Sequence, residues 1–364
     1  MGIYWILVAG IFLISIPIQP CRSKTKNAIY LWIVFILLFA ISGFRAFSVG
    51  ADTQTYANLF HRIQYISNDD SRYESGFLTY IRVLNRITDN PGILLIASSM
   101  ICIGAVCYFA YKLSENAPLS ILLYILMGSY FSQMNVMRQA LALSITEIAF
   151  LILILKGNHF REKVISAGLI VLATTFHSGA GIAFIPYILL ITSTLRMCFF
   201  STAKKMLKVT IIVAVGSFIG YSLIMALASS IAPAYAGYFS GTWSDSNYNA
   251  ALFNTLIPLT FAIAGATILG DELLNRKQQF AAIMISFSIV FNTLSMRMEI
   301  WNRMAGMFNI YTYLLWTPEF VCRIKKAKSR GVILILIVTF SALYMWMVLT
   351  FRPEWSRAVP YAIR

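Results

Sequence analysis

Four short polar segments stand out in this chain of 364 residues, because each places arginine, carboxylate or imidazole groups beside a long apolar stretch. The segments are residues 45–60, 137–139, 176–179 and 297–303. A guanidinium group donates two parallel hydrogen bonds to a phosphate, so arginines at these places are typical of a site for a phosphate-bearing ligand. A neighbouring carboxylate or imidazole could accept a proton during catalysis.

The first segment combines a carboxylate with an aromatic face. Asp52, Tyr56 and Phe60 recur every four residues, which places them on one side of an expected helix. Asp52 is therefore a candidate general base, although it also suits the N-cap of that helix, with Gly50 supplying the turn before it. Arg45 either binds a substrate anion or anchors the end of the preceding apolar stretch at the membrane interface.

The second and third segments are expected at the tips of helical hairpins. An arginine within a membrane costs at least about 2.5 kcal/mol, so Arg138 should face a polar cavity and a partner, with Gln139 beside it, unless its side chain reaches the interface. His177 could accept a proton or donate to an anion, and a structural hydrogen bond is the alternative. Glu147 lies deep in the apolar stretch after Arg138, where an ionisable group is a functional candidate by default.

Glu74, Arg297 and Arg303 complete the set of candidate site residues. Glu74 precedes another expected helix, so it is a second candidate base or it complements the positive end of that helix. Arg297 and Arg303 flank Glu299, which predicts two substrate-binding arginines, or one ion pair and one interfacial anchor. The sequence contains no DxD or HExxH metal pattern, no P-loop and no G-x-S-x-G motif. We therefore expect no metal site and no cofactor.

The composition predicts an all-α, polytopic integral membrane protein. Hydrophobic residues make up 59% of the chain and charged residues 12%, and the mean hydropathy is +0.74. A net charge of +15 would indicate nucleic-acid binding in a soluble protein. Here the positive-inside rule explains most of it, so we expect the lipid bilayer and no nucleic acid as a partner. The five cysteines lie in expected spans or on the lysine-rich side, so no disulfide is expected.

The basic residues predict the topology. All lysines fall in six short basic segments, whereas the basic residues between those segments are arginines, so the lysine-rich side should be cytoplasmic. Several apolar stretches run about 32 to 41 residues, too long for one crossing, and each is expected to form a hairpin. This predicts about twelve transmembrane helices with both termini external. The expected spans are residues 2–18, 28–44, 91–111, 118–134, 138–155, 164–177, 179–195, 209–228, 251–269, 280–296, 303–320 and 331–350.

The expected organisation is a single transmembrane domain, residues 1–364, with two long external loops. Residues 45–90 exceed a normal connection, which favours a functional loop. Within them Phe77, Ile81 and Leu84 recur at helical spacing and predict an amphipathic helix on the membrane surface. Residues 229–250 are aromatic and amide-rich, which suits stacking against sugar rings or an ordinary interfacial loop.

Taken in order along nearly the whole chain, these motifs resemble the EpsG-type, Wzy-like polysaccharide polymerases of bacteria. The motifs are Arg45…Gly50-x-Asp52…Tyr56…Phe60, Glu74-x-Gly76-Phe77, Met137-Arg138-Gln139, Phe176-His177-Ser178, Arg303 before an aromatic-rich span, and Pro360-Tyr361. The resemblance implies a metal-independent, GT-C-like glycosyltransferase that makes O-antigen, capsule or exopolysaccharide. It would transfer the growing glycan from polyprenyl diphosphate, such as undecaprenyl diphosphate, to the next carrier-linked repeat unit.

The resemblance also implies a place in the cell and partners. The protein would be a multi-pass protein of the bacterial inner (plasma) membrane, with its active site on the periplasmic or extracellular side. A flippase and a chain-length regulator are the implied protein partners, and a polyprenyl-diphosphate-linked oligosaccharide is the implied substrate.

The implied chemistry divides the candidate residues into two groups. Asp52 is favoured as the base that deprotonates the acceptor hydroxyl, with Glu74 and His177 as rivals. Substrate binding is expected of Arg45, Tyr56, Arg138, Gln139, Arg297 and Arg303. Three rival functions remain. A lipid-linked oligosaccharide flippase would need charged groups along a path through the membrane. An O-antigen ligase shares the chemistry, and a membrane acyltransferase would need a cytosolic entry route for a thioester.

Overall fold

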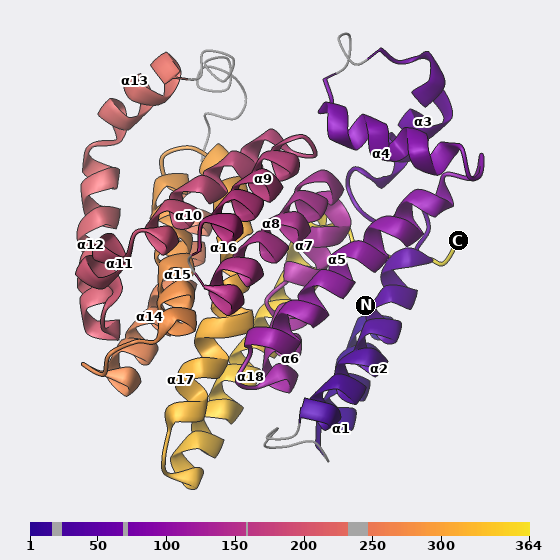
Figure 1. The fold of residues 1–364 in the computed structure, drawn as a ribbon. Coiled ribbons are helices and arrows are strands. Elements are labelled where there is room, and N and C mark those ends of the chain that lie inside the picture. Colours follow the sequence, from indigo (N-terminus) through magenta and orange to yellow (C-terminus); the bar gives the residue numbers. More distant parts are fainter. Residues whose placement is uncertain (17–23, 68–71, 158, 232–246) are drawn as a thin grey trace. The chain divides into compact units, whose positions relative to one another are not determined.

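The computed structural model describes residues 1–16, 24–67, 72–157, 159–231 and 247–364. Within these residues every regular element is a helix, and β pairing is limited to two isolated bridges, Arg45 with Ile363 and Thr202 with Leu273. The chain divides into two compact units, Met1–Tyr187 with Lys328–Arg364, and Ile188–Ala327 (Figure 1). The all-α class expected from the sequence is confirmed.

The first unit carries a row of three packed helices, in which α5 contacts both α2 and α8. Helix α9 packs on α8, and α3 and α4 lie together at one end of the row (Figure 1). The helices that lie wholly or partly in this unit are α1 (Gly2–Ser15), α2 (Lys24–Gly43), α3 (Thr53–Arg62), α4 (Ser75–Asn85), α5 (Gly92–Leu113), α6 (Ala117–Leu126), α7 (Ser129–Asn135), α8 (Met137–Lys156), α9 (Phe160–Thr174), α10 (Phe184–Ile191), α18 (Ala327–Phe351) and α19 (Pro353–Ser356), with the 3-10 turns η2 (Ile63–Tyr65) and η3 (Ser178–Ala183).

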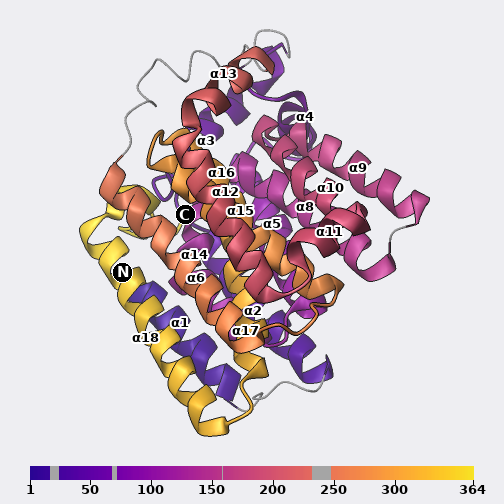
Figure 2. The ribbon, with the colours of Figure 1, turned by 90° about the vertical axis from the view of Figure 1, so that its left-hand side faces the viewer.

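The second unit is built around α15, which packs against α12, α14 and α16. Figure 2 shows α12, α14 and α15 side by side. Helix α15 starts with a capping box. The Asn275 side chain accepts from the Gln278 N–H, and the Gln278 side chain accepts from the Asn275 N–H. The elements are α11 (Ser193–Phe200), α12 (Ala203–Ile219), α13 (Tyr221–Ile231), α14 (Tyr248–Leu269), α15 (Arg276–Ser295), α16 (Ile300–Tyr311), the π helix η5 (Thr312–Trp316) and α17 (Thr317–Arg323).

Membrane-crossing helices are numerous in both units. Among the described residues six helices are long and apolar enough to cross a membrane, namely α2, α5, α8, α14, α15 and α18. Three further pairs, each bent by more than 40°, raise the number to nine if each pair is one span. These pairs overlap the expected spans 118–134, 179–195 and 209–228. The chain is therefore a multi-pass membrane protein.

The break between α6 and α7 determines where Arg138 lies. Gly128 has a φ of 82°, a left-handed conformation that side chains disfavour, and the two helices meet there at 56°. Helix α7 ends at Asn135 and α8 starts at Met137, so Val136 alone separates them. The tight tip expected from the sequence is confirmed, and Arg138 lies in the first turn of α8.

Helix α4 packs its apolar face against protein. Phe77, Ile81 and Leu84 are buried in a cluster that includes Phe60 of α3 and Leu95 of α5. Burying a side chain of this kind stabilises a fold by about 1.5–3 kcal/mol. The sequence predicted an amphipathic helix at this place with its apolar face toward the membrane surface. In the structure that face is covered by the protein, because α3 and α5 lie against it.

Gly76 lies where α4 touches the end of α9. The N–H groups of Gly76 and Phe77 both donate to the Thr175 carbonyl, at 2.9 and 3.2 Å. A methyl group at Gly76 would lie 2.8 Å from that backbone oxygen. We expect Gly76→Ala to lower the free energy of unfolding by about 1–3 kcal/mol, measured by thermal unfolding of the purified protein. In the control Gly181→Ala the new methyl meets only Thr174, at 3.7 Å, so equal melting temperatures for the two variants would contradict this packing.

Candidate active site

Arg138 is the centre of a polar cluster in the first unit. Its Nη1 lies 2.5 Å from Glu74 Oε2, and its Nε donates to the Tyr56 hydroxyl at 3.1 Å. The Tyr73 ring lies 5.1 Å from the guanidinium carbon, a cation–π contact. The Arg138 side chain is 25% exposed and that of Glu74 is 18% exposed. Three groups therefore hold the guanidinium, while a quarter of the Arg138 side chain remains accessible.

Glu74 joins two segments that are distant in the sequence. Its Oε2 forms the ion pair with Arg138. Its Oε1 accepts a hydrogen bond from the Ser178 N–H at 2.9 Å and lies 3.7 Å from His177 Nδ1. Glu74 is the N-cap residue of α4, but its side chain makes no capping hydrogen bond. Glu74 therefore does not cap α4 through a hydrogen bond, because both carboxylate oxygens are engaged elsewhere. The interpretation that its charge complements the N-terminus of α4 stays a prediction.

Asp52 is the N-cap residue of α3, yet its side chain makes no capping hydrogen bond. The Tyr56 hydroxyl instead donates to Asp52 Oδ2 over a long 3.5 Å. Burial raises the pKa of Tyr56 to about 12, so this hydroxyl keeps its proton at neutral pH. Gly50, with a φ of 101°, supplies the expected turn. Contacts thus run from Arg138 through Tyr56 to Asp52, which is half-buried.

Five of the nine predicted site residues meet in this cluster. They are Asp52, Tyr56, Glu74, Arg138 and His177. Sequence reasoning missed Tyr73 and the Ser178 N–H as members. Both stand directly beside residues that were predicted, and an aromatic ring before a carboxylate was the signal available for Tyr73.

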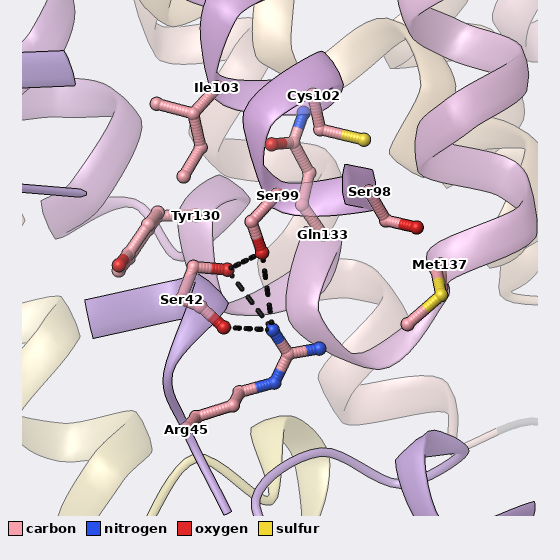
Figure 3. A pocket seen from close by; sticks show the side chains of 9 residues that line it. All are labelled: Ser42, Arg45, Ser98, Ser99, Cys102, Ile103, Tyr130, Gln133 and Met137. Carbon is pink, nitrogen blue, oxygen red and sulfur yellow. Dashed lines mark hydrogen bonds between the residues drawn. The ribbon is translucent and has the colours of Figure 1, made fainter. Parts of the chain in front are cut away.

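Arg45 is buried rather than presented to a ligand, with 2% of its surface exposed. Its guanidinium donates to the carbonyls of Val49 and Met134. It also donates to the carbonyl and hydroxyl of Ser42 and to the hydroxyl of Ser99, and Figure 3 shows these bonds. Burial lowers the pKa of Arg45 to about 10, which leaves it charged at neutral pH. The Ser42 and Met134 carbonyls belong to the C-terminal turns of α2 and α7, where a cation is favourable. Arg45 therefore ties the segment before Asp52 to the segment before Arg138.

The C-terminal residues hold the same segment. The Ala46 N–H donates to the Ala362 carbonyl and the Gly50 N–H to the Arg357 carbonyl, both at 2.8 Å. The Tyr361 hydroxyl donates to a carbonyl of α2 at 2.9 Å. The Pro360-Tyr361 motif near the end of the chain thus contributes to the framework of the cluster.

Three further predicted residues remain, Gln139 in the first unit and Arg297 and Arg303 in the second. Gln139 is buried in α8 at 9% exposure. Arg297 and Arg303 are exposed residues of the second unit, and the guanidinium carbon of Arg297 lies 4.2 Å from the centre of the Phe218 ring. Of the predicted second loop, residues 229–250, the part 232–246 lies outside the described residues.

The contacts of Glu74 predict an acid-dependent stability. Burial alone would raise the pKa of its carboxyl, but the Ser178 N–H and the Arg138 cation outweigh burial and hold the pKa below its ordinary value of 4.5. A group with a lowered folded-state pKa contributes stability above its unfolded pKa and loses it as the pH falls through the folded value. We expect the melting temperature of Glu74→Gln to fall less steeply than that of the wild type between about pH 6 and about pH 3. Parallel curves would show that Glu74 is not so paired.

The fold and the cluster together define an all-helical, multi-pass membrane protein with an arginine–carboxylate site at the start of α8, one of its candidate spans. A model of the EpsG family matches residues 28–363, and the chain belongs to this family. The matched range includes all nine predicted site residues. Membership indicates an exopolysaccharide-type polymerase, a glycosyltransferase-like enzyme of polysaccharide biosynthesis. No curated protein and no solved structure matches the chain.

Proposed function

We propose that this protein transfers a growing glycan from a polyprenyl diphosphate carrier to the next carrier-linked repeat unit. The observation that carries the proposal is the Arg138 guanidinium, which Glu74 and Tyr56 hold in place while 25% of the side chain stays exposed. A guanidinium so fixed suits a diphosphate, because its charge and its donors are already oriented.

In the proposed reaction, a hydroxyl oxygen of the acceptor sugar bonds to the anomeric carbon of the donor. The bond from that carbon to the carrier diphosphate breaks, and the diphosphate leaves with the bonding electrons. Arg138 stabilises the negative charge that develops on this leaving group. The proton of the acceptor hydroxyl passes to a carboxylate. The diphosphate needs no proton to leave, so one base is sufficient and no metal is required in the proposal.

Asp52 is the base in this proposal, and Glu74 positions Arg138. Both oxygens of Glu74 are engaged and its pKa is lowered, which makes it a weak proton acceptor. Among the described residues the Asp52 carboxylate makes one long contact, to Tyr56, and therefore has lone pairs available for a substrate. His177 lies beside Glu74 and remains the rival base. Arg297 and Arg303 are kept as substrate-binding residues on the sequence argument.

The proposal includes twelve crossings in a GT-C-like arrangement, with both termini external. Beyond the nine spans already described, this count needs three more crossings, by the 14-residue apolar α1, the 15-residue α9, and the contiguous α16, η5 and α17. These segments overlap the expected spans 2–18, 164–177 and 303–320. By the distribution of lysine, the site would face the periplasmic or extracellular side of the bacterial inner membrane.

The direct test is whether the purified protein elongates a defined polyprenyl-diphosphate-linked repeat unit. We expect a ladder of products in the presence of a chelator and without nucleotide sugar. Unchanged single units would contradict the proposal, as would elongation that requires a nucleotide sugar or a divalent metal. Movement of the unit across a vesicle membrane without elongation would indicate a flippase, and transfer to lipid A would indicate a ligase. Addition of the flippase and chain-length regulator should alter product length only.

A further inference from the structure

A groove of about 440 Å³ lies between α2 and α5, two candidate membrane spans of the first unit. Its mostly apolar walls come from residues within 28–35 of α2 and within 100–111 of α5. The walls are accessible, since Trp32 is 66% exposed and Tyr108 is 52% exposed. Gly104 also lines the groove, and a Cβ there would contact only Phe35, at 3.7 Å. The groove is therefore open toward the lipid, and no side chain divides it at Gly104.

The length of the groove matches one leaflet of a bilayer. Along α5 the wall runs from Met100 to Tyr111, a rise of about 17 Å at ~1.5 Å per residue. The hydrocarbon core of a bilayer is about 30 Å thick, so one leaflet supplies about 15 Å. Helix α5 ends at Leu113, so the groove runs from the middle of this span to the membrane surface at its C-terminal end. One acyl chain of a single leaflet therefore fits its length.

Lys112 places a positive charge at the surface end of the groove. It lies in the last turn of α5, and its ammonium group lies 5.3 Å from the centre of the Tyr108 ring and 5.2 Å from the centre of the Tyr111 ring. Both rings line the groove. Cation–π contacts with two wall residues thus hold the ammonium beside the mouth of the groove.

The same end of the groove carries further positive charge. A Cβ at Gly43, the last residue of α2, would lie 3.6 Å from the Cα of Ile96 near the start of α5, so the two helices are antiparallel. Lys24 and Lys26, which are exposed in the first turn of α2, therefore lie toward the C-terminal end of α5. Glu115, an exposed carboxylate, follows α5 at this end, and the lysines outnumber it.

We propose that this groove binds an anionic phospholipid, whose acyl chain lies along the walls and whose phosphate pairs with Lys112. An apolar groove alone would accept the chain of any lipid. The ammonium held at its surface end favours a headgroup with net negative charge, because basic groups between membrane helices attract such headgroups. By the distribution of lysine, the lipid would belong to the cytoplasmic leaflet. The proposed glycan transfer gives this groove no role.

The test uses the purified full-length protein in detergent micelles and a phosphatidylglycerol that carries a photoreactive diazirine in one acyl chain. We expect saturable labelling within residues 28–35 and 100–111, located by mass spectrometry and competed by unlabelled phosphatidylglycerol. Phosphatidylcholine should compete about fivefold more weakly, as the attraction of one lysine for an anionic headgroup implies.

Three outcomes of this experiment would overturn the proposal. The first is equal competition by phosphatidylcholine, which would remove the preference for negative charge. The second is stronger competition by a polyprenyl phosphate than by phosphatidylglycerol, which would assign the groove to a carrier lipid. The third is labelling spread evenly over the exposed residues of α12 and α18, which would show only the lipid that surrounds every membrane helix.

Two variants separate the headgroup from the chain. Lys112→Gln removes the charge and should abolish most of the preference for phosphatidylglycerol while the chain still labels the groove. Gly104→Leu fills the groove without touching Lys112 and should abolish saturable labelling. Lys156→Gln is the matched control, because Lys156 is also an exposed lysine in the last turn of a candidate span, α8, and it should behave as the wild type.

The variants can also contradict the site. Equal loss of preference in Lys112→Gln and Lys156→Gln would overturn the proposal, as would an unchanged preference in Lys112→Gln. Labelling at the wild-type level in monodisperse Gly104→Leu would do the same. The comparison of lipids needs no variant, and no readout depends on glycan transfer.

Discussion

Replacing Arg138 by alanine should leave single repeat units on the cell surface and reduce elongation by the purified protein by at least about 10²-fold. The guanidinium is the group that would stabilise the departing diphosphate, and its Nε and Nη1 already point to fixed partners, Tyr56 and Glu74. Arg138→Lys keeps the charge, but an ammonium group lacks the planar geometry with which Arg138 donates to Tyr56 and Glu74 together. This variant should therefore also lose most of the activity.

Arg72 is the matched control for Arg138. Its guanidinium carbon also lies 5.1 Å from the centre of the Tyr73 ring, but Arg72 is exposed and pairs with no carboxylate among the described residues. Arg72→Lys should give wild-type chain lengths. If Arg138→Ala and Arg138→Lys also gave wild-type chain lengths with normally folded protein, the diphosphate-binding role of Arg138 would be wrong.

Asp52→Asn should lower the elongation rate by about 10²- to 10⁴-fold with little change in apparent affinity for the donor, because it removes the proton acceptor and keeps the shape. Asparagine is as good an N-cap as aspartate, so a purely capping role for Asp52 predicts no effect. The measurement is the rate of elongation at saturating and at low donor concentration, together with the melting temperature.

The control for Asp52 is Asp89→Asn, an exposed carboxylate in the same long loop, which should behave as the wild type. Full activity of Asp52→Asn would remove Asp52 from the mechanism. A loss confined to His177→Gln would then move the base to the imidazole. Glu74→Gln is less selective, because it also leaves Arg138 without its ion-pair partner.

The class of the protein could be predicted from local properties of the chain. Hydropathy, the lengths of apolar stretches and the separation of lysine from arginine depend only on neighbouring residues, and a bilayer core of about 30 Å converts them into helices and hairpins. Local spacing also predicted the helix starting at Thr53 and the tight tip before Arg138, both of which the structure shows. The bends inside three of the spans were not predicted, because a bend depends on packing.

The partners of the site residues could not be predicted in this way. Glu74 is 64 residues from Arg138 and 104 residues from Ser178 in the sequence. Residue type marked each of them as a candidate, but it also allowed Glu74 to serve the end of its own helix. The contact of Gly76 with Thr175 brings these segments together, and that contact depends on the absence of a side chain at Gly76.

The sequence by itself determined that this is an all-helical, multi-pass membrane protein whose candidate arginines and carboxylates, Glu147 excepted, lie at the ends of its apolar stretches or between them. Only the tertiary structure distinguished the buried arginines from the accessible ones. Arg45 and Arg138 both follow apolar segments, but Arg45 is 2% exposed and Arg138 keeps a quarter of its side chain accessible. The reason is physical: two helix C-termini converge on Arg45 and take up its donors, whereas the groups that contact Arg138 at the start of α8 leave a quarter of its side chain accessible.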